Sequence, residues 1–350
     1  MAKKNKIARR PQARTSTSPA RRRAASARPF RLLFTSAGRR VELLREFRRA
    51  AGDLKVELEI HAVDCQPTAP ALCVADFAQV VPPIAQGYID RLVDYCGQKS
   101  IDAVVPLIDP ELQPLSNARR RLADVGTRLV ISDASVIRVS QDKILTSQFL
   151  LQHGFRTPRI LSNGELATAR LPLFIKPRCG SASLGAFKID TLEALHYYRR
   201  TYPDSVIEEF VEGQEYTVDV FCDFAGRPLC AVPRMRIEVR GGEVSKSLTV
   251  RHEGMIAESL RLAKALAGCM GMMTVQCFLS RADEVVFNEI NPRFGGGVPL
   301  SIRAGADSPR WLLELLLGRT PSASMDGWVG QMFMLRYDSA FFCSSQELPG

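Results

Sequence analysis

The segment from Met273 to Gly297, MTVQCFLSRADEVVFNEINPRFGGG, concentrates side chains that could bind a metal ion. Its pattern is typical of two strands joined by a short polar turn. Side chains alternate between the faces of a strand, so Glu289 and Asn291 share one face. A connection of about four residues places Gln276 opposite Glu289 on that face. Hard Mg²⁺ prefers such oxygen ligands, together with phosphates and water. The pattern predicts a metal–triphosphate site; the competing interpretation is an ordinary polar edge of a sheet.

A second group of residues is suited to binding phosphate. Lys176 ends a predicted strand just before Pro177 and points toward the turn 180–185, GSASLG. Backbone amides in such a turn can cradle phosphate oxygens. Taken singly, Lys176 is equally compatible with a surface charge. The sequence contains no G-K-[ST], H-R-D or D-F-G motif, which disfavours the P-loop and protein-kinase ways of holding ATP.

Between these motifs, residues 206–216 (VIEEFVEGQEY) form an apolar strand that ends in acids. A strand edge can offer backbone donors and acceptors to adenine, and a carboxylate can accept hydrogen bonds from ribose hydroxyls. This motif alone does not identify a nucleotide site.

The elements that must position these residues fall into two groups. Strands alternate with helices up to residue 131, which implies an α/β fold with a parallel sheet and right-handed crossovers. Ligands collect at the carboxyl ends of such strands, so loops 35–40, 64–67 and 108–111 are the informative ones. The predicted strands are 31–34, 57–63, 103–108 and 128–131, and the predicted helices are 41–51, 88–96 and 111–123.

From about Ser132 the pattern changes and a second unit begins. Strands 173–176 and 186–189 form a predicted hairpin around the 180–185 turn. The other predicted strands lie near Arg159 and at 205–211, 215–222, 229–232, 273–279 and 284–290, and the predicted helices are 142–152, 191–200 and 255–270.

The net charge of +10 resides in the N-terminal tail. Residues 1–31 contain eleven Lys and Arg residues and no acid, so the remainder carries a net charge of −1. A near-neutral body has no bulk attraction for a polyanion, whereas a basic arm can bind one with strong salt dependence. The tail composition also resembles an organellar transit peptide, but its close-set basic residues and missing apolar run disfavour a secretory signal.

Nine cysteines include no C-x-x-C pair, which is typical of free thiols in a reducing compartment. Four histidines show no metal-ligand spacing, and no apolar run approaches the roughly 18 residues of a membrane span. We therefore expect a cytoplasmic protein without a membrane segment, and nucleic-acid binding, if any, through the basic tail alone.

In their order along the chain these motifs resemble those of the ATP-grasp superfamily, in particular carbamoyl-phosphate-synthase-like and pyrrolysine-biosynthesis-ligase-like proteins. The resemblance covers residues 30–320 and rests on Asp142-Lys143, Ile175 to Pro177, Glu208 to Val211, Glu215 to Asp219, Gln276 and Asn288 to Arg293. It implies an N-terminal Rossmann-like pre-ATP-grasp domain followed by a two-lobed α+β ATP-grasp domain. The expected boundaries are 1–29 (basic tail), 30–132 (pre-ATP-grasp domain), 133–205 (small lobe with linker helix), 206–320 (large lobe) and 321–350 (C-terminal extension).

The resemblance also implies roles for individual residues. Mg²⁺, with Mn²⁺ as the alternative, would be bound by Gln276, Glu289 and Asn291, and Arg293 and Lys176 would act on the transferring phosphoryl group. The loop departs from the family pattern at Ala182 and Leu184, which puts turnover in question. The ATP-binding residues implied are Lys143, Lys176, Gly180, Ser181, Ser183 and Gly185 for phosphates, Glu209, Phe210 and Val211 for the adenine hinge with Glu208 next to them, and Glu215 for ribose.

The function expected is that of an ADP-forming carbon–nitrogen ligase, in which a carboxylate becomes an acyl phosphate and an amine displaces the phosphate. Acids can hold a substrate ammonium and arginines a carboxylate, which favours an amino acid or peptide as substrate. Two alternatives stay open: phosphorylation of carbonate or carbamate, and a nucleotide-binding regulator without turnover. A homodimer is also left open. The candidate substrate residues, where the two units meet, are Arg39, Arg40, Asp109, Glu111, Arg234, Arg236, Lys246 and Arg303.

Overall fold

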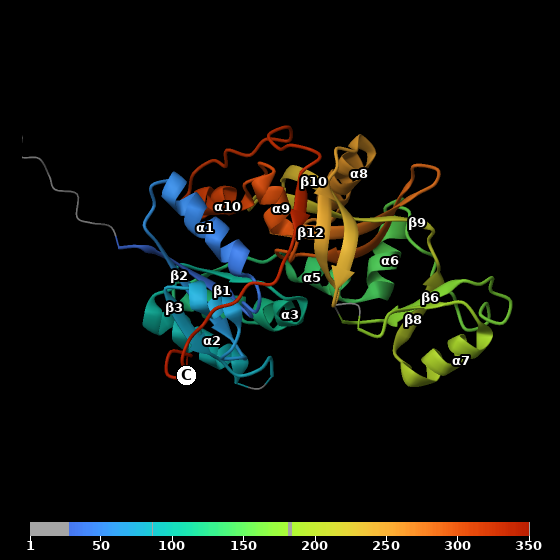
Figure 1. Cartoon of the computed structure of the whole chain (residues 1–350), viewed down its shortest axis with the longest axis horizontal. Coiled ribbons are helices and arrows are strands. Elements are labelled where there is room, and N and C mark those ends of the chain that lie inside the picture. Colours follow the sequence, from blue (N-terminus) through green and yellow to red (C-terminus); the bar gives the residue numbers. More distant parts are fainter. Residues whose placement is uncertain (1–27, 86, 181–183, 350) are drawn as a thin grey trace, which may run out of the picture.

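The structure, a computed structural model, describes residues 28–85, 87–180 and 184–349. In this part of the chain the strands form a five-stranded, a three-stranded and a six-stranded sheet. The five-stranded sheet lies at one end of the molecule and the three-stranded sheet at the other, with the six-stranded sheet between them (Figure 1). We call these parts the N-terminal domain, the small lobe and the large lobe. The predicted fold class, a Rossmann-like domain followed by a two-lobed α+β domain, is confirmed.

The N-terminal domain is a parallel sheet of strand order β3-β2-β1-β4-β5. Helix α1 buries Leu43, Leu44 and Phe47 against this sheet, as its amphipathic pattern predicts. The predicted helix 111–123 is two helices, because Ala118 leaves helical geometry (φ −91°, ψ 2°). The elements are β1 (Phe30–Thr35), α1 (Val41–Asp53), β2 (Leu58–Asp64), η1 (Pro70–Val74), β3 (Phe77–Val80), α2 (Tyr88–Lys99), β4 (Ala103–Pro106), α3 (Asp109–Asn117), α4 (Arg119–Asp124) and β5 (Arg128–Leu129).

Two basic residues of segment 1–31 belong to this folded domain: Arg28, which the prediction assigned to the tail 1–29, and Arg31, which it assigned to the first strand. Arg28 donates to both carboxylate oxygens of Asp102, at 2.8 and 2.6 Å, and Arg31 pairs with Glu59 at 2.9 Å. The other nine basic residues of the tail lie in residues 1–27, outside the described part of the chain.

The small lobe is an antiparallel sheet, β7-β6-β8, backed by one helix. Its core contains Leu173, Ile175, Ile189 and Leu195. The strand predicted near Arg159 is reduced to an isolated bridge between Ile160 and Glu208 of β8, with no full strand around it. The elements, with the two preceding linker helices, are α5 (Ala134–Gln141), α6 (Lys143–Gln152), β6 (Leu173–Pro177), β7 (Phe187–Ile189), α7 (Leu192–Thr201) and β8 (Ser205–Glu209).

The large lobe is a six-stranded antiparallel sheet of order β13-β12-β9-β10-β11-β14. The predicted strand 229–232 extends to Arg240, and the chain then turns back as a further strand that was not predicted. The prediction missed both because residues 234, 236, 238 and 240 are charged, which is not typical of a buried strand. The elements are β9 (Gly213–Cys222), β10 (Pro228–Arg240), β11 (Glu243–Thr249), α8 (Glu253–Ala265), β12 (Gly271–Ser280), β13 (Val285–Asn291), α9 (Val298–Arg303), α10 (Ser308–Leu316) and β14 (Phe333–Leu335).

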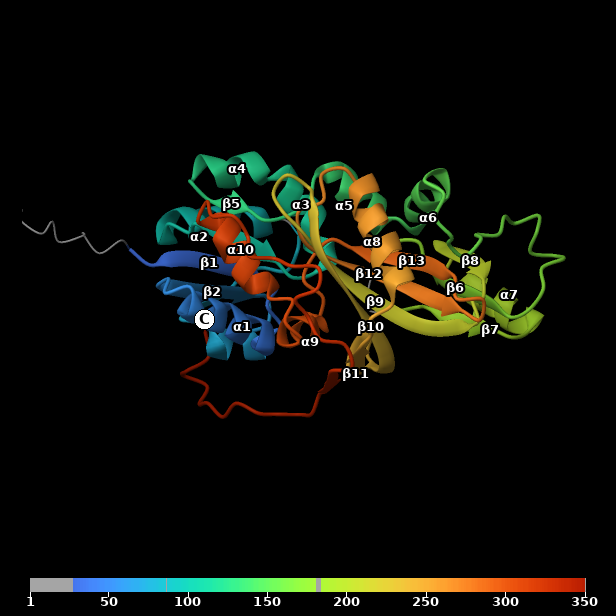
Figure 2. The same cartoon turned by 90° about the horizontal axis from the view of Figure 1, so that it is seen from above.

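The N-terminal domain and the large lobe share one hydrophobic core. Phe47 of α1 lies edge-on to both Phe34 of β1 and Phe294, with ring centroids 4.9 and 5.6 Å apart. Helix α1 also packs against α9 and α10, as Figure 2 shows. This shared core brings the carboxyl end of the parallel sheet close to residues 291–297.

Candidate active site

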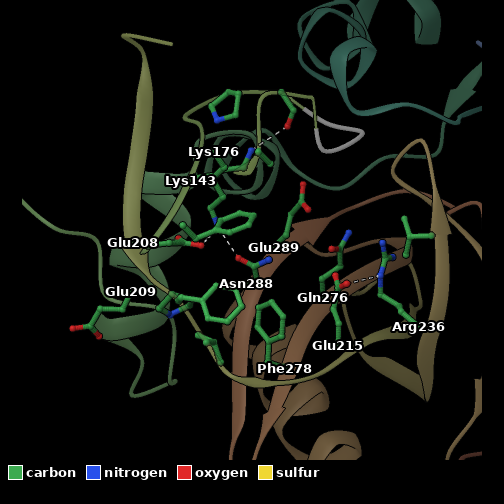
Figure 3. Close-up of a pocket in the computed structure, with 18 of the residues that line it drawn as sticks. Lys143, Lys176, Glu208, Glu209, Glu215, Arg236, Gln276, Phe278, Asn288 and Glu289 are labelled. Atoms are coloured by element: carbon green, nitrogen blue, oxygen red, sulfur yellow. Dashed lines mark hydrogen bonds and ion pairs between the residues drawn. The ribbon is translucent and has the colours of Figure 1, made fainter. Parts of the chain in front are cut away.

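Two adjoining cavities contain most of the predicted site residues. The interlobe cavity, of about 290 Å³, lies between the small and large lobes and is shown in Figure 3. The interdomain cavity, of about 180 Å³, lies between the N-terminal domain and the large lobe. Arg236, Gln276 and Glu289 line both cavities and therefore form the wall that they share.

Lys176 links the two lobes from the end of β6. Its ammonium donates to Asn288 Oδ1 at 2.5 Å and pairs with Glu208 Oε1 at 2.8 Å. Only 6% of Lys176 and 5% of Glu208 are exposed. Burial raises the pKa of Glu208, and the Lys176 ammonium opposes that rise. The pair fixes a positive charge in the wall of the interlobe cavity.

Lys143 brings a second ammonium to this cavity from the first turn of α6. Its Nζ donates to the backbone carbonyl of Gly180 at 3.1 Å. The preceding residue, Asp142, caps α6 and pairs with Arg178 at 2.6 Å, which anchors the helix start beside β6. Lys143 and Lys176 lie on the same side of the cavity, above Glu289 in Figure 3. Of the predicted loop residues, Ser181 and Ser183 lie outside the described residues, and Gly185 is close to Pro177 and Tyr202.

The predicted pairing of the two strands is confirmed: Gln276 of β12 lies opposite Glu289 of β13, and Thr274 lies opposite Asn291. Within the described residues, neither Gln276 nor Glu289 makes a side-chain hydrogen bond or ion pair. Burial raises the pKa of Glu289; the charge on Asp109 adds to that rise, and the three neighbouring cations Lys143, Lys176 and Arg293 oppose it. These oxygen atoms without protein partners are suited to a hard cation.

Asn288 is a site residue that the alternation of faces did not predict. Gln276 pairs with Glu289 and Cys277 with Phe287, so Asn288 is the extra residue of a β-bulge. The bulge turns Asn288 toward Lys176 while Glu289 still lines the same cavity. No residue type in this stretch signals a bulge.

The opposite wall of the interlobe cavity comes from the segment between β8 and β9. The backbone N–H and C=O groups of Phe210 and Val211 make no hydrogen bond within the described residues. Glu209 also lines the cavity, but its side chain points outward and pairs with Arg159 at 2.9 Å. Glu215 follows at the start of β9 and pairs with Arg236 at 3.0 Å. Free backbone groups on an apolar wall, with a carboxylate beyond them, are suited to a heterocyclic base and its sugar.

The interdomain cavity contains Asp109 at the start of α3 and Arg293 after β13. Arg293 Nη2 donates to Asp109 Oδ2 at 2.7 Å. Burial lowers the pKa of Arg293, but the carboxylates of Asp109, Glu289 and Glu243 together outweigh burial, so the pKa lies above its ordinary value. Asn291 lies beside this pair, and with its amide turned so that Nδ2 faces Asp109 the nitrogen is 3.2 Å from both carboxylate oxygens.

Arg234 is 1% exposed and is held by Asp219, at 2.6 Å from Nε and 2.8 Å from Nη2. Its remaining nitrogen, Nη1, is buried and has no hydrogen-bond partner within the described residues. The glycine run makes room for it: a Cβ on Gly297 would lie 2.3 Å from Arg234 Nη1, and one on Gly296 would lie 2.3 Å from Arg40 Nη1. The triple glycine therefore lets two guanidinium groups approach the backbone.

Four candidate substrate residues line neither cavity. Glu111 is fully buried and accepts hydrogen bonds from Ser36, Tyr88 and the amides of residues 107 and 108. Glu111 therefore stabilises the start of α3 from inside the N-terminal domain and is not accessible to a substrate in either cavity. The other three lie on the surface and pair with acids: Arg303 with Glu46, Arg39 with Glu243, and Lys246 with Glu238.

Within the described residues, no helix is long and apolar enough to cross a membrane. These residues also contain no group of three or more His, Cys, Asp and Glu side chains arranged around a common metal position. The predicted magnesium ligands do not conflict with this finding, because two of the three are amides.

Comparison with known proteins agrees with the fold. Residues 140–297 match the family described as "ATP-grasp domain", and residues 32–130 match "PylC-like, N-terminal domain". The chain therefore belongs to the ATP-grasp superfamily and joins an ATP-grasp domain to a PylC-like N-terminal domain.

Individual relatives are distant. D-alanine–D-alanine ligase of Streptomyces coelicolor is 32% identical over 153 residues, which cover 37% of this chain and 38% of the relative. 3-Methyl-D-ornithine–L-lysine ligase of Methanosarcina acetivorans is 26% identical over 182 residues, 51% of this chain and 46% of the relative.

Among solved structures, the biotin carboxylase domain of Hydrogenobacter thermophilus 2-oxoglutarate carboxylase aligns with a TM-score of 0.69 at 16% identity, covering 88% of this chain and 74% of that one. That likeness shows the fold alone. The chain spans from 35% to 64% of the length of the curated relatives it matches.

Proposed function

We propose that the protein is an ADP-forming carboxylate–amine ligase that makes an amide or peptide bond through an acyl phosphate. One observation carries the proposal: Gln276 and Glu289, whose side chains have no partner in the part of the chain that the structure describes, stand in the wall shared by the two cavities. A cation there is within reach of a nucleotide on one side and an acceptor on the other. The D-alanine–D-alanine ligase and the 3-methyl-D-ornithine–L-lysine ligase reported among the relatives support the same reaction class.

The residues fit a magnesium nucleotide in the interlobe cavity. Gln276, Glu289 and Asn291 would hold Mg²⁺, or Mn²⁺: the first two offer oxygen atoms at the shared wall, and Asn291 lines the interdomain cavity beside them. Lys143 and Lys176 would bind phosphate oxygens. A bound magnesium nucleotide supplies a phosphoryl group whose negative charge is already partly neutralised.

The nucleoside would occupy the other end of the same cavity. The unpaired backbone groups of Phe210 and Val211 would bind adenine, and Glu215 would accept from the ribose hydroxyls. Glu208 lies next to the hinge, but its carboxylate is occupied by Lys176. Its role is therefore to position that lysine.

The acceptor chemistry belongs to the interdomain cavity. A substrate carboxylate oxygen attacks the γ-phosphorus in line, the bond to the bridging oxygen breaks, and ADP leaves. An amine then attacks the acyl carbon, phosphate leaves, and the amine loses one proton. Arg293 would hold the acyl phosphate oxygens, and Arg234 Nη1, which has no partner among the described residues, would donate to a substrate carboxylate. Asp109 would accept from a substrate ammonium.

The size and charge of this cavity favour a small zwitterionic substrate. Its volume is about 180 Å³, and it offers guanidinium and carboxylate groups within one space. An amino acid or a short peptide end meets both requirements. A cytoplasmic location and a homodimer stay predictions.

The test is ADP formation by the full chain with Mg-ATP and a pool of amino acids, followed by mass spectrometry of the products. We expect ADP, phosphate and a new amide in equal amounts, and none of them from Glu289→Gln. Glu258→Gln, on the exposed face of α8, is the matched control and should keep wild-type activity. ADP formation by Glu289→Gln near the wild-type rate would contradict the metal assignment.

One observation favours the alternative function, a nucleotide-binding regulator without turnover. Leu184 lines the interlobe cavity with 77% of its surface exposed, and it adds no positive charge beside the phosphate positions. ATP binding without ADP formation across a broad pool of acids and amines would favour a nucleotide-binding regulator over a ligase.

A further inference from the structure

A third hollow lies beside the interdomain cavity, and none of the roles proposed above uses it. This hollow, of about 310 Å³, is here named the basic groove, and its walls include Arg39, Arg40, Glu243, Gly296, Arg336 and Tyr337. Arg40, Glu243 and Gly296 line both the groove and the interdomain cavity, so the two spaces are neighbours.

The charges of the groove are unbalanced around one carboxylate. Glu243 pairs with Arg40 at 2.7 Å, Arg336 at 3.2 Å and Arg39 at 3.5 Å. Within the described residues these three guanidinium groups have no other acidic partner. The three cations hold the pKa of Glu243 below its ordinary value despite its burial. Counted over the whole lining, five arginines (Arg39, Arg40, Arg45, Arg240 and Arg336) and three acids (Glu42, Glu243 and Asp338) leave a net charge of +2.

Part of this surplus is also shielded from water. The side chain of Arg40 is 13% exposed. Burial, together with the like charges of Arg293 and Arg336, lowers its pKa to about 10, although Glu243 opposes that change. A partly buried guanidinium among like charges is stabilised by an added anion more than a solvated one, because its interactions are screened less. The groove thus favours a bound anion on electrostatic grounds.

The start of helix α1 adds to the positive electrostatic potential of the basic groove. The helix spans Val41–Asp53; within the described residues no side chain caps its first turn, which lines the groove and contains one acid, Glu42. Unpaired amides and the helix dipole at such an end favour negative charge. The backbone amides at the start of α1 and the guanidinium groups of the three arginines therefore all offer hydrogen-bond donors to the basic groove.

The C-terminal segment completes the groove. Strand β14 pairs with β11. Just after β14, the guanidinium of Arg336 donates to the backbone carbonyl of Gly296. From there the chain runs along the N-terminal domain, as the red trace shows in Figures 1 and 2. Tyr337 and Phe341 of this segment line the groove together with the arginines. The lining therefore combines cations with a surface suited to a short carbon chain.

We infer that the basic groove binds a second carboxylate of the substrate, at the far end from the group that reacts in the interdomain cavity. The substrate class is then an elongated molecule with at least two carboxylates, one of them left free in the product. Arginine forks match a planar carboxylate through paired N–H donors, which favours carboxylate over a point anion. This inference rests on the proposed function, because it treats the groove as an extension of the acceptor site.

The test measures binding by isothermal titration calorimetry with the full chain, at fixed ionic strength and without nucleotide. The probes are glutarate, a dicarboxylate, and butyrate, a monocarboxylate of nearly the same length, with inorganic phosphate as the third arm. We expect glutarate to bind about tenfold more tightly than butyrate. Arg336→Gln and Arg39→Gln should each weaken glutarate binding about fivefold or more.

Arg48→Gln is the matched control, because Arg48 lies on α1 outside the groove and pairs with Asp76. It should leave glutarate binding unchanged. Equal binding of glutarate and butyrate, or glutarate binding unaffected by Arg336→Gln, would overturn the inference. Tighter binding of phosphate than of glutarate would overturn the carboxylate assignment. This binding assay contains no nucleotide, so its result is independent of the ADP-formation assay. If the protein binds glutarate but forms no ADP, the proposed ligase function is contradicted and the anion site in the basic groove is still supported.

Discussion

Replacing Lys176 by Met separates the structural role of this lysine from its role in binding nucleotide. Lys176 and Glu208 form a pair whose side chains are 7% and 6% exposed. Removing one partner of a buried pair costs about 3–5 kcal/mol, because the other charge stays buried without compensation. Burial already raises the pKa of Glu208, so the carboxylate can take up a proton and the lower figure applies. At about 2–4 °C per kcal/mol, the unfolding midpoint should fall by about 6–12 °C.

The same reasoning fixes the pH dependence. In Lys176→Met the pKa of Glu208 is raised further in the folded state and is ordinary in the unfolded state. The loss of stability should therefore grow as pH rises through the folded-state pKa, and fade below the unfolded-state pKa of about 4.3. Thermal unfolding of the variant and the wild type between pH 5 and 8 measures this trend. A midpoint difference that is constant with pH would refute the argument.

The double variant Lys176→Met/Glu208→Gln provides the second control. It removes both charges, so most of the lost stability should return. ATP affinity, measured by calorimetry, should stay reduced by about tenfold or more, since the phosphate ligand is still missing. Recovery of ATP binding together with stability would show that Lys176 serves the fold alone.

Three further predictions address other parts of the site. Gly297→Ala should lower kcat/KM for the acceptor by about tenfold with little change in the KM for ATP, because its Cβ would lie 2.3 Å from Arg234 Nη1. Steady-state kinetics measure this split, and Gly52→Ala, with no atom within 4 Å of its Cβ, is the control. Glu111→Leu should lower the free energy of unfolding, measured in urea, by about 3 kcal/mol, because it leaves four donors unpaired. ATP affinity should not change. A loss of substrate binding without a loss of stability would instead support Glu111 as a substrate residue. Deletion of residues 1–27 should abolish any salt-sensitive binding of nucleic acid in a filter assay and keep the unfolding midpoint, because Arg28 and its partner Asp102 remain; retained binding would assign it to the folded body.

The sequence predicted the local features of this protein because they depend on neighbouring residues. Alternation along two strands placed Glu289 opposite Gln276, and the strand–helix order defined a parallel sheet with its ligand edge near residue 109. Each of these inferences needed only the period of an element or the length of a turn.

Only the tertiary structure decided which charged residues meet. Nothing near Glu111 in the sequence indicates that Ser36 and Tyr88 enclose it, so its carboxylate appeared equal to that of Asp109, two residues away. The bulge at Asn288 and the passage of Arg336 across the chain to Glu243 are likewise set by packing between distant segments. A charged side chain carries no mark of its partner in the sequence, because burial and pairing are properties of the assembled fold.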